Sequence, residues 1–114
     1  MKRLPLAIVL LAALHLFALS CAKKDALPPA HLDPLARSQA LIDSGNASFK
    51  RADYETAAKR YASATLVKPD DPAAFYGLGM ALSKLGRDED ARTAYAKARA
   101  LAGSAGDSVF STPH

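Results

Sequence analysis

The side chains that could perform chemistry are few in this sequence, and they stand far apart. Beyond the first twenty residues the histidines are His31, in a proline-containing segment, and His114, at the last position. General acid–base catalysis requires a base that a folded scaffold holds within hydrogen-bond reach of the substrate, and neither position offers one. Acidic residues gather at positions 70–71 and 88–90, with a spacing that fits no calcium loop. The sequence therefore predicts no catalytic residue, no metal site and no cofactor.

The lone cysteine, Cys21, has a more informative position. Two basic residues open the chain, an apolar stretch runs from Leu4 to Leu19, and the small residue Ser20 comes directly before the cysteine. This order is typical of a secretory signal peptide over residues 1–20, cleaved after Ser20. An uncleaved membrane helix is the alternative, but the apolar stretch is shorter than the roughly 20 residues that a spanning helix needs.

Residues 19–22, Leu-Ser-Cys-Ala, resemble the lipobox of bacterial lipoproteins. The resemblance implies that Cys21 is a lipidation site, joined through sulfur to diacylglycerol, and that it becomes an acylated amino terminus. Lipoboxes prefer leucine three residues before the cysteine, whereas this chain has Ala18 there and Leu19 one position later. Ordinary signal cleavage at the same bond is the alternative, and it would leave a secreted protein with a free thiol. Ala22, in place of aspartate, resembles the outer-membrane sorting class of some bacteria, so we expect a lipoprotein of the cell membrane or outer membrane.

The charge of the chain excludes some kinds of partner. Removing residues 1–20 takes away Lys2 and Arg3 and no acidic residue, so the formal net charge falls from +4 to +2. The remaining basic residues are scattered among acidic ones and form no run suited to phosphates, so nucleic acid is not expected as a partner. A single cysteine also excludes an internal disulfide and a cysteine-based metal site.

Residues 38 to 102 repeat themselves with a period of 34 and need no insertion or deletion to do so. The matching pairs include Gly45 and Gly79, Lys50 and Lys84, Ala57 and Ala91, and Tyr61 and Tyr95. This period is typical of helix–turn–helix units that stack on one another. Apolar residues recur at spacings of three and four, which favours helices over strands.

Aspartate–proline pairs and glycines mark where the helices begin and end. The sequence predicts helices over about 34–51, 53–67, 72–85 and 88–102, after a flexible tether at 21–33. The folded domain is therefore placed at 34–102, with repeats at about 38–71 and 72–105. Gly103 is expected to end the last helix, and residues 103–114 are expected to form a disordered tail.

The repeats resemble the tetratricopeptide repeat (TPR) family. The residues that carry the resemblance in the second repeat are Phe75, Leu78, Gly79, Leu82, Ala91, Tyr95 and Ala98. Those in the first are Tyr54, Ala57, Tyr61, Ala64 and Pro69. The family implies an all-α fold in which two tandem repeats make a short right-handed solenoid. We expect Gly45 and Gly79 to face alanines of the paired helices, and Tyr61 and Tyr95 to fill the space between hairpins.

The family also implies a concave groove, lined by the first helix of each repeat, that receives a peptide or a partner helix. The residues of this chain predicted to line it are Ile42, Asn46, Phe49, Lys50, Tyr76, Met80 and Lys84. Aromatic and methionine side chains are common anchors for a partner. Packing between the repeats is the alternative role for Phe49 and Met80.

Two functions agree with these observations. The first is a membrane-anchored interaction module that recruits a protein partner in the cell envelope, and the same module could also be secreted without a lipid. The second is a structural or regulatory subunit that completes its repeat stack on a partner chain or by homo-oligomerising. Stacked repeats generally need about three units, so we expect Leu85 and Leu101 to lack cover in a single copy. An enzyme is not expected.

Overall fold

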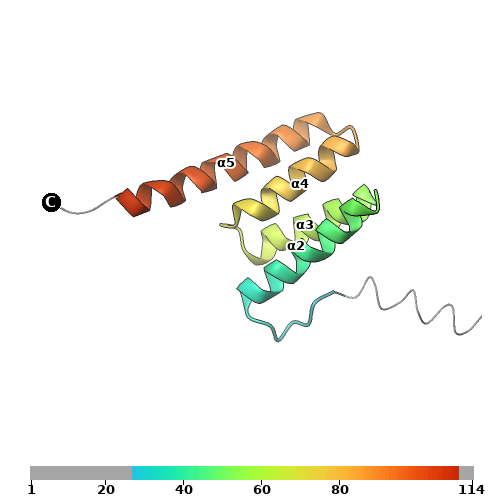
Figure 1. Cartoon of the computed structure of the whole chain (residues 1–114), viewed down its shortest axis with the longest axis horizontal. Helices are drawn as coiled ribbons and strands as arrows, with labels where there is room; N and C mark the ends of the chain where they lie inside the picture. Colours follow the sequence, from blue (N-terminus) through green and yellow to red (C-terminus); the bar gives the residue numbers. More distant parts are fainter. Residues whose placement is uncertain (1–26, 111–114) are drawn as a thin grey trace, which may run out of the picture.

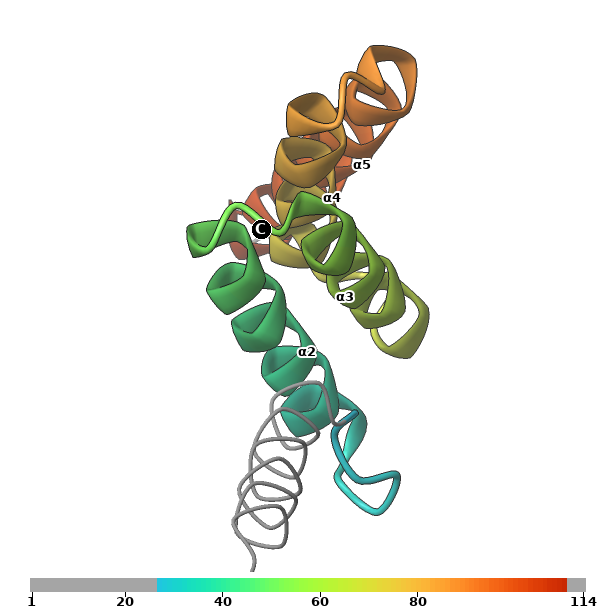
Figure 2. The ribbon, with the colours of Figure 1, turned by 90° about the vertical axis from the view of Figure 1, so that its right-hand side faces the viewer.

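The computed structural model describes residues 27–110, and this part of the chain consists of helices and their connections. The helices are α2 (Pro34–Lys50), α3 (Tyr54–Val67), α4 (Pro72–Lys84) and α5 (Asp88–Phe110). Helices α2 and α3 form one hairpin, α4 and α5 form a second, and the second hairpin stacks on the first (Figures 1 and 2). The predicted all-α class with two tandem hairpins is confirmed.

Aspartates begin the first three of these helices. Their side chains accept hydrogen bonds from backbone N–H groups of the first turn: Asp33 from Ala36 at 3.0 Å, Asp53 from Thr56 at 3.2 Å and Asp71 from Ala73 at 2.9 Å. Such a cap satisfies an N–H group that has no partner inside the helix. In α2 and α4 a proline follows the cap, where its missing N–H costs nothing. All four helices start within one residue of the positions that the sequence predicts.

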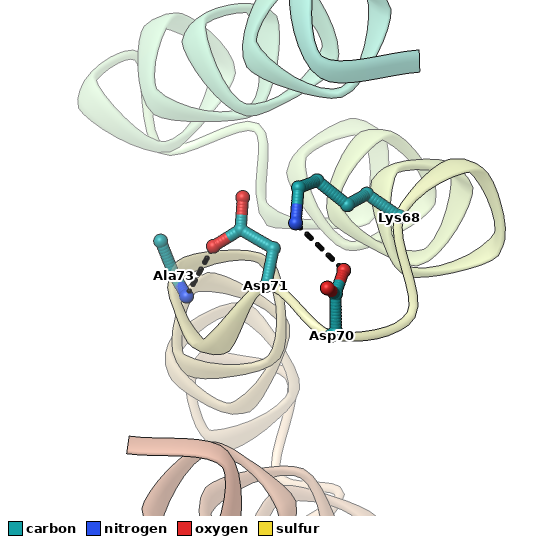
Figure 3. Close-up of polar contacts among 4 residues, drawn as sticks. All are labelled: Lys68, Asp70, Asp71 and Ala73. Atoms are coloured by element: carbon teal, nitrogen blue, oxygen red, sulfur yellow. Dashed lines mark hydrogen bonds and ion pairs between the residues drawn. The ribbon is translucent and has the colours of Figure 1, made fainter. Parts of the chain in front are cut away.

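The turn between the hairpins is held by charged side chains (Figure 3). The ammonium group of Lys68 donates to a carboxylate oxygen of Asp70 at 2.7 Å, and Asp71 caps α4 next to it. The hydrogen bond from Lys68 holds the pKa of the Asp70 carboxyl below its ordinary value. Because Asp70 is exposed, we expect this ion pair to add little to the stability of the fold.

The turns inside the two hairpins both contain a residue in the left-handed backbone conformation. Ala52 has φ of 60° and Gly86 has φ of 73°, and the two residues occupy the same place in the 34-residue repeat. Glycine adopts this left-handed conformation freely, whereas it costs a residue with a Cβ roughly 1–2 kcal/mol. The first hairpin therefore makes its turn with a strained alanine where the second uses glycine.

The predicted end of the last helix is wrong. Helix α5 continues through Gly103 and extends to Phe110, so the tail expected to begin at Gly103 is helical over most of its length. Gly103 lacks the positive φ that lets Gly86 end α4. Alanine, the strongest helix former, flanks it at Ala100, Ala102 and Ala105. Residues 111–114 lie outside the described part of the chain.

The core is built around the ring of Tyr61, which is 1% exposed. A Cβ placed on Gly45 of α2 would lie 2.8 Å from this ring, and one placed on Gly77 of α4 would lie 2.3 Å from it. The ring therefore fills a slot that exists because two neighbouring helices carry glycine there. Around it the core includes four fully buried alanines: Ala57, Ala64, Ala74 and Ala81.

These contacts correct the expected role of the glycines. Gly45 and Gly79 do not serve mainly to bring alanines close, because the ring of Tyr61 lies over Gly45 and the ring of Tyr95 lies over Gly79. The expectation that Tyr61 fills the space between the hairpins is confirmed, and Gly77 provides the space on the α4 side. Leu85, expected to lack cover, packs against the core, so that expectation is wrong.

Candidate functional site

Four of the seven predicted groove residues are exposed on α2 and α4. They are Asn46 and Lys50 on α2, and Tyr76 and Lys84 on α4; together they are called the groove face below. Tyr76 is 55% exposed, which is unusual for so large a ring. The two helices contact one another directly, so these side chains belong to neighbouring elements of one surface.

Ile42 does not belong to this surface, and its assignment to the groove is wrong. It is 6% exposed and lies in the core with Leu41 and Tyr61, because α2 turns this side toward the helices that pack on it. Phe49 is half-buried and packs edge-on against the ring of Tyr54, with ring centroids 5.1 Å apart. Met80 is also half-buried. Phe49 therefore packs against Tyr54 within its own hairpin, and Met80 reaches the surface only in part.

Asn46 connects the groove face to the core. Its side-chain oxygen accepts a hydrogen bond of 2.6 Å from the hydroxyl of Tyr61. This bond gives the buried tyrosine a partner for its polar end, which a buried hydroxyl requires. Burial also raises the pKa of Tyr61, so the ring stays a neutral donor. The amide of Asn46 is thus held in place from below while its outer side faces solvent.

Lys50 and Lys84 occupy matching places at the carboxyl ends of their helices. Each stands in the last turn, where a cation meets the negative end of the helix dipole. The ion pairs found in the described residues involve other cations: Lys59, Lys68, Arg87 and Arg92. The positive charges of Lys50 and Lys84 are therefore both exposed and available to an acidic group.

Sequence reasoning missed a second surface, at the outer end of the second hairpin. A hollow of about 540 Å³ is bounded there by Pro72, Ala73, Tyr76, Tyr95, Ala98, Arg99 and Ala102; this surface is called the end face below. The rings of Tyr76 and Tyr95 lie against one another, with centroids 5.5 Å apart. Burial and the neighbouring Tyr76 raise the pKa of Tyr95. The sequence held one signal for this surface: Tyr95 is the equivalent of Tyr61 in the 34-residue period.

A third surface lies between α3 and α5. It is a hollow of about 570 Å³ with an apolar floor formed by Ala58, Ala62, Phe75, Leu78, Leu82 and Ala94. Its rim carries both signs of charge, from Glu55, Lys59, Arg87, Asp90 and Lys97. Two ion pairs on the rim, Glu55–Lys59 and Arg87–Asp90, each join opposite charges, so the rim does not favour a ligand of either charge.

The described residues contain no cluster of three or more metal-ligating side chains. Nor does any helix between residues 27 and 110 have the length and apolar character needed to cross a membrane. His31 is exposed in the segment before α2. Cys21 and His114 lie outside the described residues.

The comparisons with known proteins agree with this geometry. Residues 45–86, from the middle of α2 through α4, match the profile of the TPR repeat. A TPR repeat-containing protein of Picosynechococcus sp. is 38% identical over 76 residues, which make up 67% of this chain and 19% of that relative. The chain therefore spans about a fifth of the relative's length.

The structure has stacked hairpins with a 34-residue period, small residues beneath tyrosine rings and an exposed face on the first helix of each hairpin. These features define a helical-repeat protein of the interaction type. The chain belongs to the tetratricopeptide repeat family. TPR repeats are protein–protein interaction modules, and the fold is generally non-catalytic.

Proposed function

We propose that this protein is a membrane-anchored interaction module of the cell envelope, in which the groove face binds an acidic segment of a partner protein. The observation that supports this most directly is the shared exposure of Tyr76, Lys50 and Lys84 on the neighbouring helices α2 and α4. Aromatic rings are enriched among the residues that dominate binding energies. Charges on the rim of such a site mainly speed association and select the partner.

Charge reversal of the two groove lysines tests the binding surface. We expect the double variant Lys50→Glu/Lys84→Glu to lose the protein that co-purifies with the wild type from detergent-solubilised membranes, because two attractive contacts become repulsive. Lys59→Glu/Lys97→Glu is the matched control, since it makes the same change in net charge on α3 and α5. Loss of the partner from both variants, or from neither, would contradict a role for the groove face.

The anchor is proposed to be lipid on Cys21. Support comes from the sequence alone: the only cysteine stands at the predicted cleavage site, directly after an apolar stretch. Acyl chains bind membranes with about 0.8 kcal/mol per buried CH₂, so several chains hold a protein where a single chain binds reversibly. The domain would then lie outside the cytoplasm, connected to the bilayer by residues 21–33.

Replacing Cys21 with serine should release the protein from the membrane fraction or halt its processing, because serine cannot form the thioether. Cell fractionation followed by mass spectrometry of the amino terminus measures both outcomes. Cys21→Ser protein that is cleaved normally and still sediments with membranes would refute the anchor while leaving the groove face untouched.

The second candidate function, a subunit that completes its repeat stack by association, is supported by a different observation. The end face is apolar and open, although the corresponding surface of the first repeat is covered by α4. Homo-oligomerisation and a partner chain would both cover it.

A further inference from the structure

The end face of the second repeat corresponds to a surface of the first repeat that α4 covers. Tyr61 is 1% exposed because α4 lies over it, with Gly77 against the ring. Tyr95 occupies the same place 34 residues later, but its ring meets one glycine, Gly79, beside the ring of Tyr76, and remains partly exposed. No described element packs on its outer side, because α5 contacts α4 alone. The second tyrosine therefore has one of the two glycine contacts that the first one has.

Helix α5 carries glycines that its own chain does not explain. A Cβ on Gly45, Gly77 or Gly79 would collide with a tyrosine ring, which accounts for the absence of a side chain there. A Cβ on Gly103 or Gly106 would have nothing within 4 Å. Glycine in a helix interior is less favourable than alanine by about 1 kcal/mol. In this protein helical glycines otherwise mark the place of a tyrosine ring.

Gly106 lies on the same side of α5 as Tyr95. The two residues are separated by eleven positions, which is about three full turns of an α-helix. Ala102, which lines the end face, lies between them on that side. Gly103 is eight positions from Tyr95, a little more than two turns, so it lies on the flank of this surface. In Figure 1 the red end of α5 extends past the other helices.

We infer that two copies of this chain pair through antiparallel α5 helices, with Tyr95 of each copy packed on Gly106 of the other. Helix α5 carries both halves of the contact. The ring of Tyr95 lacks a second glycine, and Gly106 lacks a ring. In the antiparallel register that joins them, Arg99 of one copy lies opposite Ala102 of the other. The same patch thus serves both copies, as a two-fold interface requires.

A second copy suits this surface for reasons of size and polarity. The end face is lined by rings, alanines and a proline, with Arg99 as its one charged residue. The long stem of an arginine can cover apolar surface while its charged group reaches solvent. Small residues at Ala98, Ala102 and Gly106 allow two helix backbones to approach closely. The inference rests on the second candidate function and specifies it as pairing of two copies, and it is independent of the first, since neither the groove lysines nor Cys21 takes part in the contact.

Two glycine variants form the test. Sedimentation equilibrium of the purified full chain in a non-ionic detergent should show a concentration-dependent dimer. Gly106→Leu should raise the dimer dissociation constant about tenfold or more, because the new side chain occupies the place of the opposing ring. Gly103→Leu is the matched control: it makes the same change, in the same helix, where a single copy is equally open. It should leave the dissociation constant unchanged, and circular dichroism should show both variants folded.

A second measurement tests the direction of the helices. In a Cys21→Ser background, copies carrying Arg99→Cys and copies carrying Ala102→Cys are mixed and treated with a short bis-maleimide. The antiparallel register predicts faster cross-linking in the mixture than in either variant alone. A monomer at all concentrations, equal effects of the two leucine variants, or cross-linking no faster in the mixture would each overturn the inference.

Discussion

Gly77→Leu is expected to lower the melting temperature of the domain by about 10 °C or more. A Cβ at this position would already lie 2.3 Å from the ring of Tyr61, which is closer than real Cβ contacts come. The ring has little room to move aside, because Gly45 of α2 also lies against it and Asn46 binds its hydroxyl. Overpacking costs about 1–3 kcal/mol, and each kcal/mol lowers the melting temperature of so small a domain by about 4–8 °C. Thermal unfolding followed by circular dichroism measures the change.

The neighbouring glycine provides an internal comparison for this prediction. Gly79→Leu brings a side chain to within 2.7 Å of Tyr95, but that ring is partly exposed and can turn toward solvent. Its effect should therefore be clearly smaller than that of Gly77→Leu. Equal melting temperatures for Gly77→Leu and the wild type would show that the two hairpins do not meet at Tyr61.

Tyr61→Ala should destabilise the domain by about 3–5 kcal/mol, the usual range for removing a buried aromatic ring. The substitution leaves a cavity among helices α2, α3 and α4, and none of the glycines around it can fill the space. Small domains have total stabilities of about 5–15 kcal/mol, so a large share of the molecules would unfold at moderate temperature. Urea denaturation gives the free energy of unfolding.

Two further variants separate the contributions to this loss. Tyr61→Phe keeps the ring and removes only the hydrogen bond to Asn46, so about 1 kcal/mol is expected. Tyr95→Ala removes a ring of the same size from a partly exposed place, so it should cost less than Tyr61→Ala. A loss for Tyr95→Ala as large as that for Tyr61→Ala would mean that the two repeats are equally buried, contrary to the geometry described.

The fold could be predicted from the sequence because its signals are local. Asp33, Asp53 and Asp71 each stand before a helix and cap it in the structure, and the 34-residue period assigns both hairpins without knowledge of their contacts. The end of α5 could not be predicted in this way. Glycine ends a helix only where the backbone turns left-handed, as at Gly86. The alanines around Gly103 favour a continued helix, but they do not fix the backbone conformation of the glycine itself.

The candidate surfaces were only partly predictable, because a period identifies equivalent positions and not the partners they meet. Ile42 and Tyr76 are equivalent in the repeat, yet Ile42 is buried in the core and Tyr76 is 55% exposed. The end face has no motif of its own. It arises because the second hairpin presents outward the side that the first presents to α4, and this becomes visible only once the hairpins are stacked.

The position of Tyr61 also gives the domain a direction of unfolding. The stability of stacked repeats is approximately the sum of each unit and its contacts with neighbours. Through Tyr61, α3 is joined to helices on both sides, whereas α5 rests on α4 alone. Backbone amides should therefore exchange with solvent soonest in the outer half of α5 and latest in α3. A module with this gradient is firm at the end that leads to residues 21–33 and looser at the far end, so a neighbour that binds there can stiffen it without touching the groove lysines.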